Sequence, residues 1–464
     1  MGGGLLQLVA YGAQDVYLTG NPQITFFKVV YRRHTNFAME AIEQTFSGNP
    51  NYGNTVYCQI SRNGDLIHRS YLEVGIKKLA SNDNSYVNYL GLRLLKQVSI
   101  EIGGQQIDKH YSDWLYIWNE LSLPMGKRFA YDTMVGADSD ALNKAAYSNN
   151  GDEITYLYIP LEFWFCRNIG LSLPLIALQY HEVKIKIDFE TFANCTFSKV
   201  TPWNNVVAGE TTSTSLQNPK LWVDYIYLDT DERRKFAQLS HEYLIEQLQF
   251  TGTETLNTSG SRVKLNFNHP CKELIWVPKI HSAVSQWYNY TFSSALISNN
   301  SNAYGNFNLP EVNLTLNEYS VSSNMPSSSA VLETAGNLID YLQDNITPYN
   351  DSLVNSSFKN PFKECLLQLN GNDRFNVRNG TYFNLVQPYQ HHTNIPRNRG
   401  INVYSFALKP EEHQPSGTLN MSRIDTAILD LKVLDSVSGS VNIYAVNYNV
   451  LRILSGMGGL AYSN

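Results

Sequence analysis

The stretch VSIEIGGQQID, residues 98–108, decides the predicted fold. Its apolar residues Val98, Ile100 and Ile102 alternate with polar ones, and this period of two is what a half-buried β-strand requires. The following pair, Gly103-Gly104, supplies a turn that tolerates positive φ, so the chain can fold straight back. We therefore predict a β-hairpin at this position.

The same pattern returns far downstream as CLLQLNGNDRF, residues 365–375. Asn370-Gly371 occupies the place of the glycine pair, and Asn-Gly is the strongest two-residue hairpin signal. In each half the hairpin is followed by an aromatic strand, a Pro- and Gly-punctuated passage, an alternating strand and a closing aromatic strand. We therefore predict that the halves superpose, with Gly104 and Gly371 at equivalent turns.

Many short strands in two repeats, with few helices, indicate an all-β protein. We predict two consecutive eight-stranded jelly rolls with long loops and few short helices; the alternative is one large irregular β-domain. The predicted divisions are an extended N-terminal arm at 1–25, a first roll at 26–228, a charged linker at 229–240 and a second roll at 241–464, with a long insertion at about 282–360.

Composition limits the function classes. A length of 464 residues favours two domains, and 30 Tyr and 20 Phe favour strands over helices. The formal net charge of −6 argues against direct nucleic-acid binding, because phosphate contacts need an excess of Lys and Arg. No run reaches the roughly 18 apolar residues of a membrane span.

The cysteines and the N-terminal residues give limited information about the compartment and about lipid modification. Five scattered cysteines without a CxxC pair predict buried free thiols in a reducing compartment. The start lacks the basic and apolar regions of a secretory signal. It also carries Leu6 where a myristoylation signal has Ser or Thr.

Catalytic patterns are missing from the sequence. There is no GxSxG, no P-loop, and no HExxH, because Ile185 and Ile245 stand where a second His is required. The adjacent pair His391-His392 lacks a third ligand and is interpreted as surface or capping residues. We predict no catalytic residue, no cofactor and no metal site, and hence no enzyme.

Candidate modification sites concentrate in the long polar insertion. The sequons at Asn289, Asn299 and Asn313 are candidate glycosylation sites. A segment this rich in Asn and Ser contains sequons by composition alone, and the missing secretory signal weakens the prediction.

Several long strings resemble a known family. They are LVAYGAQDVYLTGNPQITFFKVVYRRHTNFA (8–38), LPLIALQYHEVKI (173–185), WVDYIYLDTDERRKFAQLSHEYLIEQLQFTG (222–252), YSFALKPEEHQPSGTLNMSRID (404–425) and NIYAVNYNVLRILSGMGGLAYSN (442–464). Together they resemble the major capsid proteins of large icosahedral double-stranded DNA viruses, most closely those that infect algae.

This resemblance implies a double jelly roll that trimerises into a pseudo-hexameric capsomer of the virion shell. It implies synthesis in the host cytoplasm, and contacts with neighbouring capsomers and minor capsid proteins. An internal membrane and host glycans are further candidate partners, and the arm at 1–25 would fasten neighbours at the base. The alternative function is a carbohydrate-binding β-sandwich, because jelly rolls also serve as lectins.

The insertion at 282–360 carries one further expectation. It must leave both rolls closed, so we expect a solvated loop, with local strand pairing at 312–316, that projects outward from the shell as a tower.

Overall fold

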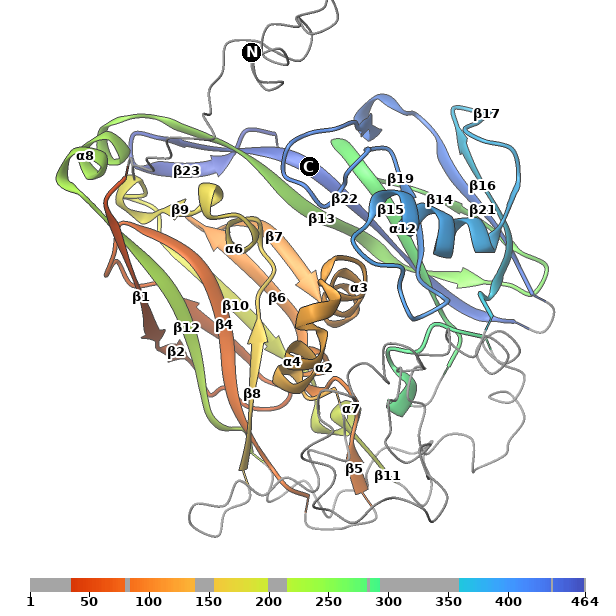
Figure 1. The fold of residues 1–464 in the computed structure, drawn as a ribbon, viewed down its shortest axis with the longest axis horizontal. Helices are drawn as coiled ribbons and strands as arrows, with labels where there is room; N and C mark the ends of the chain where they lie inside the picture. Colours follow the sequence, from red (N-terminus) through yellow and green to blue (C-terminus); the bar gives the residue numbers. More distant parts are fainter. Residues whose placement is uncertain are drawn as a thin grey trace, which may run out of the picture.

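The fold comes from a computed structural model, which describes residues 35–79, 84–137, 154–198, 215–281, 284–292, 359–434 and 437–462. Figure 1 shows two β-sandwiches side by side, joined at a seam. The predicted arm (1–25), the strand pairing at 312–316, Asn299 and Asn313 lie outside the described residues.

The first sandwich consists of two facing sheets. One sheet has the order β1 (Phe37–Gln44), β12 (Gln217–Leu228), β4 (Leu66–Lys77) and β8 (Ile154–Pro160), with β9 (Leu173–Pro174) beside β4. The other has the order β2 (Phe46–Ser47), β3 (Thr55–Gln59), β10 (Val183–Phe189), β6 (Leu95–Ile102) and β7 (Gln105–Tyr111). A small pair, β5 (Asn84–Tyr86) and β11 (Thr196–Ser198), lies apart from these sheets.

The second sandwich repeats this plan. One sheet has the order β13 (His241–Leu256), β22 (Gly439–Leu454), β15 (Pro270–Lys279) and β19 (Asn402–Ser405), with β20 (Leu419–Asn420) beside β15 and β23 (Met457–Leu460) beside β22. The other has the order β14 (Ser261–Lys264), β21 (Ala427–Val433), β16 (Phe362–Leu369) and β17 (Asn372–Asp373), with β18 (Arg378–Asn379) beside β16.

Short helices fill the loops. They are α2 (Leu90–Leu94), α3 (Ser112–Ser122), α4 (Met125–Val135), α6 (Trp164–Arg167), α7 (Phe192–Cys195), α8 (Thr230–Gln238) and α12 (Gln387–His391), with a π-helix, η5 (Tyr382–Val386), and four 3-10 turns, η2 (Ile169–Leu171), η3 (Leu175–Ala177), η4 (Val284–Gln286) and η6 (Met421–Arg423). In Figure 1 the helices α2, α3 and α4 stand between the two sandwiches.

The alternation of apolar and polar residues in the sequence corresponds to an alternation of buried and half-buried residues in the strands. Along β10, buried residues alternate with half-buried Lys184, Lys186 and Asp188. β10 pairs antiparallel with β3 on one side and β6 on the other. The period of two therefore places one face of the sheet in the core.

The hydrophobic core does not stop at the first sandwich. Its buried cluster continues through Ile245, Ile275, Tyr444 and Ile453 of the second sandwich. A separate cluster fills the interior of the second sandwich. The seam between the sandwiches is thus part of a continuous packed interior.

The charged linker at 229–240 is largely helical, as α8, and Arg233 pairs with buried Asp65 of the first sandwich at 3.0 Å. The Gly-rich residues near the C-terminus form β23. One expectation about the connecting segments needs correction. Residues 284–292, assigned to the exposed insertion, are packed in the core through Trp287, Tyr288 and Tyr290.

Candidate functional site at the seam

The two predicted hairpin turns have the same backbone geometry. Gly103 and Gly104 have φ of 59° and 83°, and Asn370 and Gly371 have φ of 50° and 79°. Positive φ at both central residues is typical of a type I′ turn, which matches the twist of the flanking strands. The first turn is also crowded: a Cβ on Gly103 would overlap the ring of His181, whereas Gly104 faces open space.

That histidine connects the first hairpin to the C-terminal strand. His181 Nδ1 lies 2.9 Å from the carbonyl oxygen of Gly458 on β23. The amide of Leu460 on the same strand donates to Gln105 Oε1 at 3.2 Å. The end of the second sandwich is therefore fastened to the predicted turn of the first.

Asn289 is a poor glycan acceptor in this fold. Its side chain is 2% exposed, and its Oδ1 accepts hydrogen bonds from the amide and hydroxyl of Thr291 at 3.0 and 2.7 Å. A glycan requires an amide accessible to solvent, so this expectation is corrected by burial.

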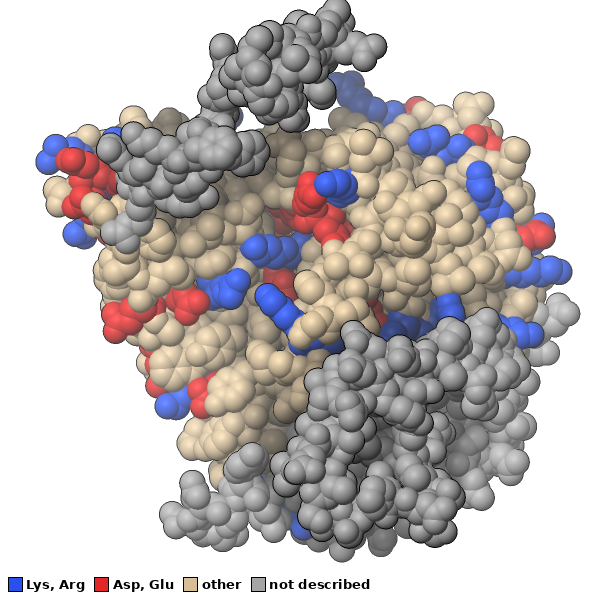
Figure 2. All heavy atoms as spheres, in the orientation of Figure 1, with Lys and Arg blue, Asp and Glu red and all other residues tan. Residues whose placement is uncertain are grey.

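The seam carries charged groups from both sandwiches, and Figure 2 shows them gathered in the furrow between the two halves. Lys279 on β15 lies 2.5 Å from Asp113 on α3, and Tyr290 donates to the same carboxylate at 2.9 Å. Trp287 Nε1 donates to the carbonyl of Asn88 at 2.9 Å. Residues 287–290, which precede the long insertion, are thus fixed to the first sandwich.

A second contact surrounds Glu120, whose side chain on α3 is 1% exposed. It pairs with Arg397 of the second sandwich at 2.9 Å and with Arg128 on α4. Arg397 also donates to the hydroxyl of Tyr89 at 3.0 Å, and Asn394 donates to the carbonyl of Leu123. A buried carboxylate with two guanidinium partners is well compensated, as burial of charge requires.

A third contact surrounds Glu246 on β13. Arg167 of the first sandwich lies 3.1 Å from Glu246 Oε2, and Lys272, with a fully buried side chain, lies 2.7 Å from Oε1. Burial alone would raise the pKa of Glu246, but His413, Lys272 and Arg167 lower it from 4.5 to about 2. Lys272 Nζ also donates to the carbonyl of Pro410 at 2.6 Å, which holds the 409–413 loop on the sheet.

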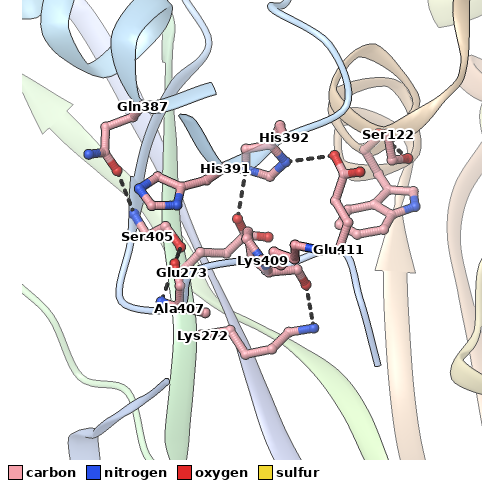
Figure 3. Close-up of polar contacts among 12 residues, drawn as sticks. Ser122, Lys272, Glu273, Gln387, His391, His392, Ser405, Ala407, Lys409 and Glu411 are labelled. Carbon is pink, nitrogen blue, oxygen red and sulfur yellow. Dashed lines mark hydrogen bonds and ion pairs between the residues drawn. The ribbon is translucent and has the colours of Figure 1, made fainter. Parts of the chain in front are cut away.

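His392 corrects the interpretation of the histidine pair as surface residues. Figure 3 shows its ring between Glu273 on β15 and Glu411 of the 409–413 loop. Nε2 lies 2.9 Å from Glu273 and Nδ1 lies 2.8 Å from Glu411, and the side chains of His392 and Glu273 are both fully buried. Burial alone would lower the pKa of His392, but the two carboxylates raise it to about 9. The ring is therefore charged at neutral pH.

These groups hold the elements of the two sandwiches together. The cavity beside Arg167 and Glu246 measures about 10 Å³, which is close to the minimum for one water molecule. Among the described residues, no group of three or more His, Cys, Asp or Glu side chains could hold a metal ion. All five cysteines are free and buried, as predicted.

The described helices include none long and apolar enough to cross a membrane. The seam residues escaped the sequence reasoning, although one signal was visible. Lys272-Glu273 interrupts the apolar strand PCKELIWVPK, residues 270–279, and both side chains are fully buried. A charged pair within such a strand needs buried partners.

Family models cover nearly the whole chain. "Major capsid protein N-terminus" matches residues 25–229, and "Large eukaryotic DNA virus major capsid protein" matches residues 232–459. The major capsid protein of Pyramimonas orientalis virus is 48% identical, and that of Paramecium bursaria Chlorella virus 1 is 44% identical, each over the full length of both chains.

Solved structures agree with this similarity. The capsid chain in the quasi-atomic model of the PBCV-1 virus capsid is 36% identical, with a TM-score of 0.71 over 95% of this chain and 100% of that one. The Faustovirus major capsid protein is 14% identical, with a TM-score of 0.65 over 96% of this chain and 94% of that one, and shows the fold alone. The two sandwiches are therefore a double jelly roll.

Proposed function

Because the chain belongs to the major capsid protein family of large eukaryotic DNA viruses, we propose that three copies assemble into a pseudo-hexameric capsomer. The protein is a structural capsid protein of the virion. A trimer of double rolls presents six similar lobes, and such a unit can pack hexagonally into a flat facet. The comparisons support this function and give no support to the carbohydrate-binding alternative.

The main observation in support of this proposal is that the two rolls are held at a constant angle to each other. Buried ion pairs and a continuous apolar core join them at the seam. Six lobes can share one lattice only if the angle within each chain is constant. A charged seam supplies this constancy, because its contacts are directional and costly to leave unpaired.

Exposed apolar groups on both rolls support a contact with another copy. On α4, Phe129 is 86% and Met125 is 66% exposed, and in the second roll Tyr389 and Leu408 are 77% and 71% exposed. Large apolar side chains on a protein surface often mark an interaction site when they lie together. We assign them to the interface between subunits.

Gel filtration with light scattering tests the trimer. The expected mass is about 158 kDa, three times the chain mass of 52.6 kDa. Phe129→Ser should shift the protein toward monomer, whereas Phe129→Tyr, which keeps the ring, should stay trimeric. A wild-type monomer at micromolar concentration would refute the assembly.

We propose further roles on the basis of the same family membership. The arm at 1–25 fastens neighbouring capsomers at the base, and the protein acts without catalysis or direct contact with the genome. It is made in the host cytoplasm, and minor capsid proteins, an internal membrane and host glycans are its candidate partners. The long insertion, which begins after residue 292, forms an external tower.

A further inference from the structure

A pocket at the edge of the second roll is lined by cations and contains no carboxylate. It measures about 270 Å³ and includes Lys359, Lys363 and Arg399. The polar wall also contains neutral hydrogen-bonding groups: Asn360, Asn379, Thr381 and Asn384. This combination of charge and donors suits carboxylates, which accept charge-assisted hydrogen bonds.

The three cations have no ion-pair partner within the described part of the chain. Lys432, which lies on the strand paired with β16, does have one: its Nζ is 2.8 Å from Glu364. The pocket wall is also held in place, because Asn384 is 2% exposed and its Nδ2 donates to the carbonyl of Arg399 at 3.0 Å. The unpaired charges therefore lie on a prearranged surface.

The two ends of the long insertion meet beside this pocket. The amide of Phe292 donates to the carbonyl of Lys359 at 2.9 Å, and the amide of Lys359 donates back at 2.8 Å. The sequence between them, residues 293–358, contains no Lys or Arg. It contains six carboxylates, Glu311, Glu318, Glu333, Asp340, Asp344 and Asp351. Since the whole chain has a formal net charge of −6, the remainder sums to zero.

We propose that this pocket binds carboxylates of residues 293–358 from the same chain. The segment is tethered at a residue that lines the pocket, so its effective concentration there is high. A free anion would have to approach six like charges on the same tether, which disfavours it. The inference goes beyond shell assembly and holds or fails independently of the trimer.

Zero-length carbodiimide coupling of the assembled protein, followed by peptide mass spectrometry, tests this directly. The reagent joins a Lys amine to a carboxylate in contact with it. We expect Lys359 or Lys363 to couple to a carboxylate of 293–358. Lys220 and Glu43, which lie 3.1 Å apart in the first roll, provide the internal positive control.

Two variants separate a specific site from general attraction. Arg399→Gln should lower the coupling yield about two- to fivefold, as the loss of one partly exposed charge contact implies. Arg452→Gln removes the same charge from an exposed pair with Glu242 on the other sheet of the second roll and should leave the yield unchanged. Salt near 1 M should reduce coupling, because the Debye length falls to about 3 Å.

Each other outcome overturns the proposal. Mixed isotope-labelled and unlabelled chains identify the donor of the carboxylate. Cross-links between labelled and unlabelled chains would assign the pocket to a neighbouring copy. No coupling of Lys359 or Lys363, with the control pair coupled, would show that the pocket binds no carboxylate.

Discussion

Replacing Glu246 by Gln should weaken the seam more than any exposed ion pair can. The carboxylate lies between Arg167 of the first roll and Lys272 of the second, at 3.1 and 2.7 Å. Its side chain is 8% exposed and that of Lys272 is fully buried. Glu246→Gln keeps the shape but leaves the buried ammonium without a counter-charge.

Two arguments give the size of the stability loss expected for Glu246→Gln. A pKa lowered from 4.5 to about 2 corresponds to about 3 kcal/mol of preference for the charged form. Removing one partner of a buried pair costs about 3–5 kcal/mol. For a chain of 464 residues that unfolds as one unit, each kcal/mol shifts the Tm by about 1 °C, so a loss near 3 kcal/mol lowers the Tm by about 3 °C.

The matched control lies on the same strand. Glu242 pairs with Arg452 at 2.8 Å, but both side chains are more than half exposed, so Glu242→Gln should cost at most about 1 kcal/mol. Differential scanning fluorimetry at pH 7 compares the two variants. Adding Lys272→Met to Glu246→Gln should restore part of the Tm, because it removes the unpaired charge.

The stabilisation that Glu246 provides should decrease at acidic pH. The folded pKa of Glu246 lies below its unfolded value, so its stabilisation is present above about pH 4.5 and is lost as the pH falls toward 2. The gap between wild type and Glu246→Gln should therefore narrow below pH 4.5. If Glu246→Gln changes the Tm no more than Glu242→Gln does, the seam does not depend on this buried charge.

Three more outcomes are expected. Gly103→Ala should lower the Tm by several degrees more than Gly104→Ala, since both have positive φ but only the former places a Cβ against an imidazole ring; equal effects would contradict this contact. The wild type should lose stability as the pH rises from about 6.5 to 9, because the raised pKa of His392 keeps its stabilising charge at lower pH. Urea titrations should show a smaller loss for His392→Asn and an unchanged loss for His391→Asn. Limited proteolysis of assembled shells should cut first within residues 293–358, and first cuts elsewhere would contradict an external tower.

The strands were largely predictable because their signal is local. Apolar and polar residues alternate along 183–189, which form β10, and Asn370-Gly371 and Gly103-Gly104 both adopt positive φ. A period of two and a turn dipeptide depend only on neighbouring residues. These local patterns are sufficient to predict the all-β class and the two similar halves of the chain.

The seam was not predictable in the same way. His392 looked like a surface residue because its partners, Glu273 and Glu411, are 119 and 19 positions away in sequence. Burial of a charge depends on which distant elements meet, and periodicity cannot report that. The strand at 457–460 has no sequence signal, because two of its four residues are glycines and its partners come from β22 and from the first roll.

The polar seam also explains how the two rolls keep a constant angle to each other. An apolar interface tolerates sliding, because hydrophobic burial is non-directional. The contacts of Glu120, Glu246 and Asp113 each require one geometry, and a small rotation of one roll would leave several buried charges unpaired at once. The cost of such a rotation rises steeply, so the two rolls act as one rigid unit. A shell built from many identical facets needs that rigidity in every chain, since an angular error in each unit would accumulate across the lattice.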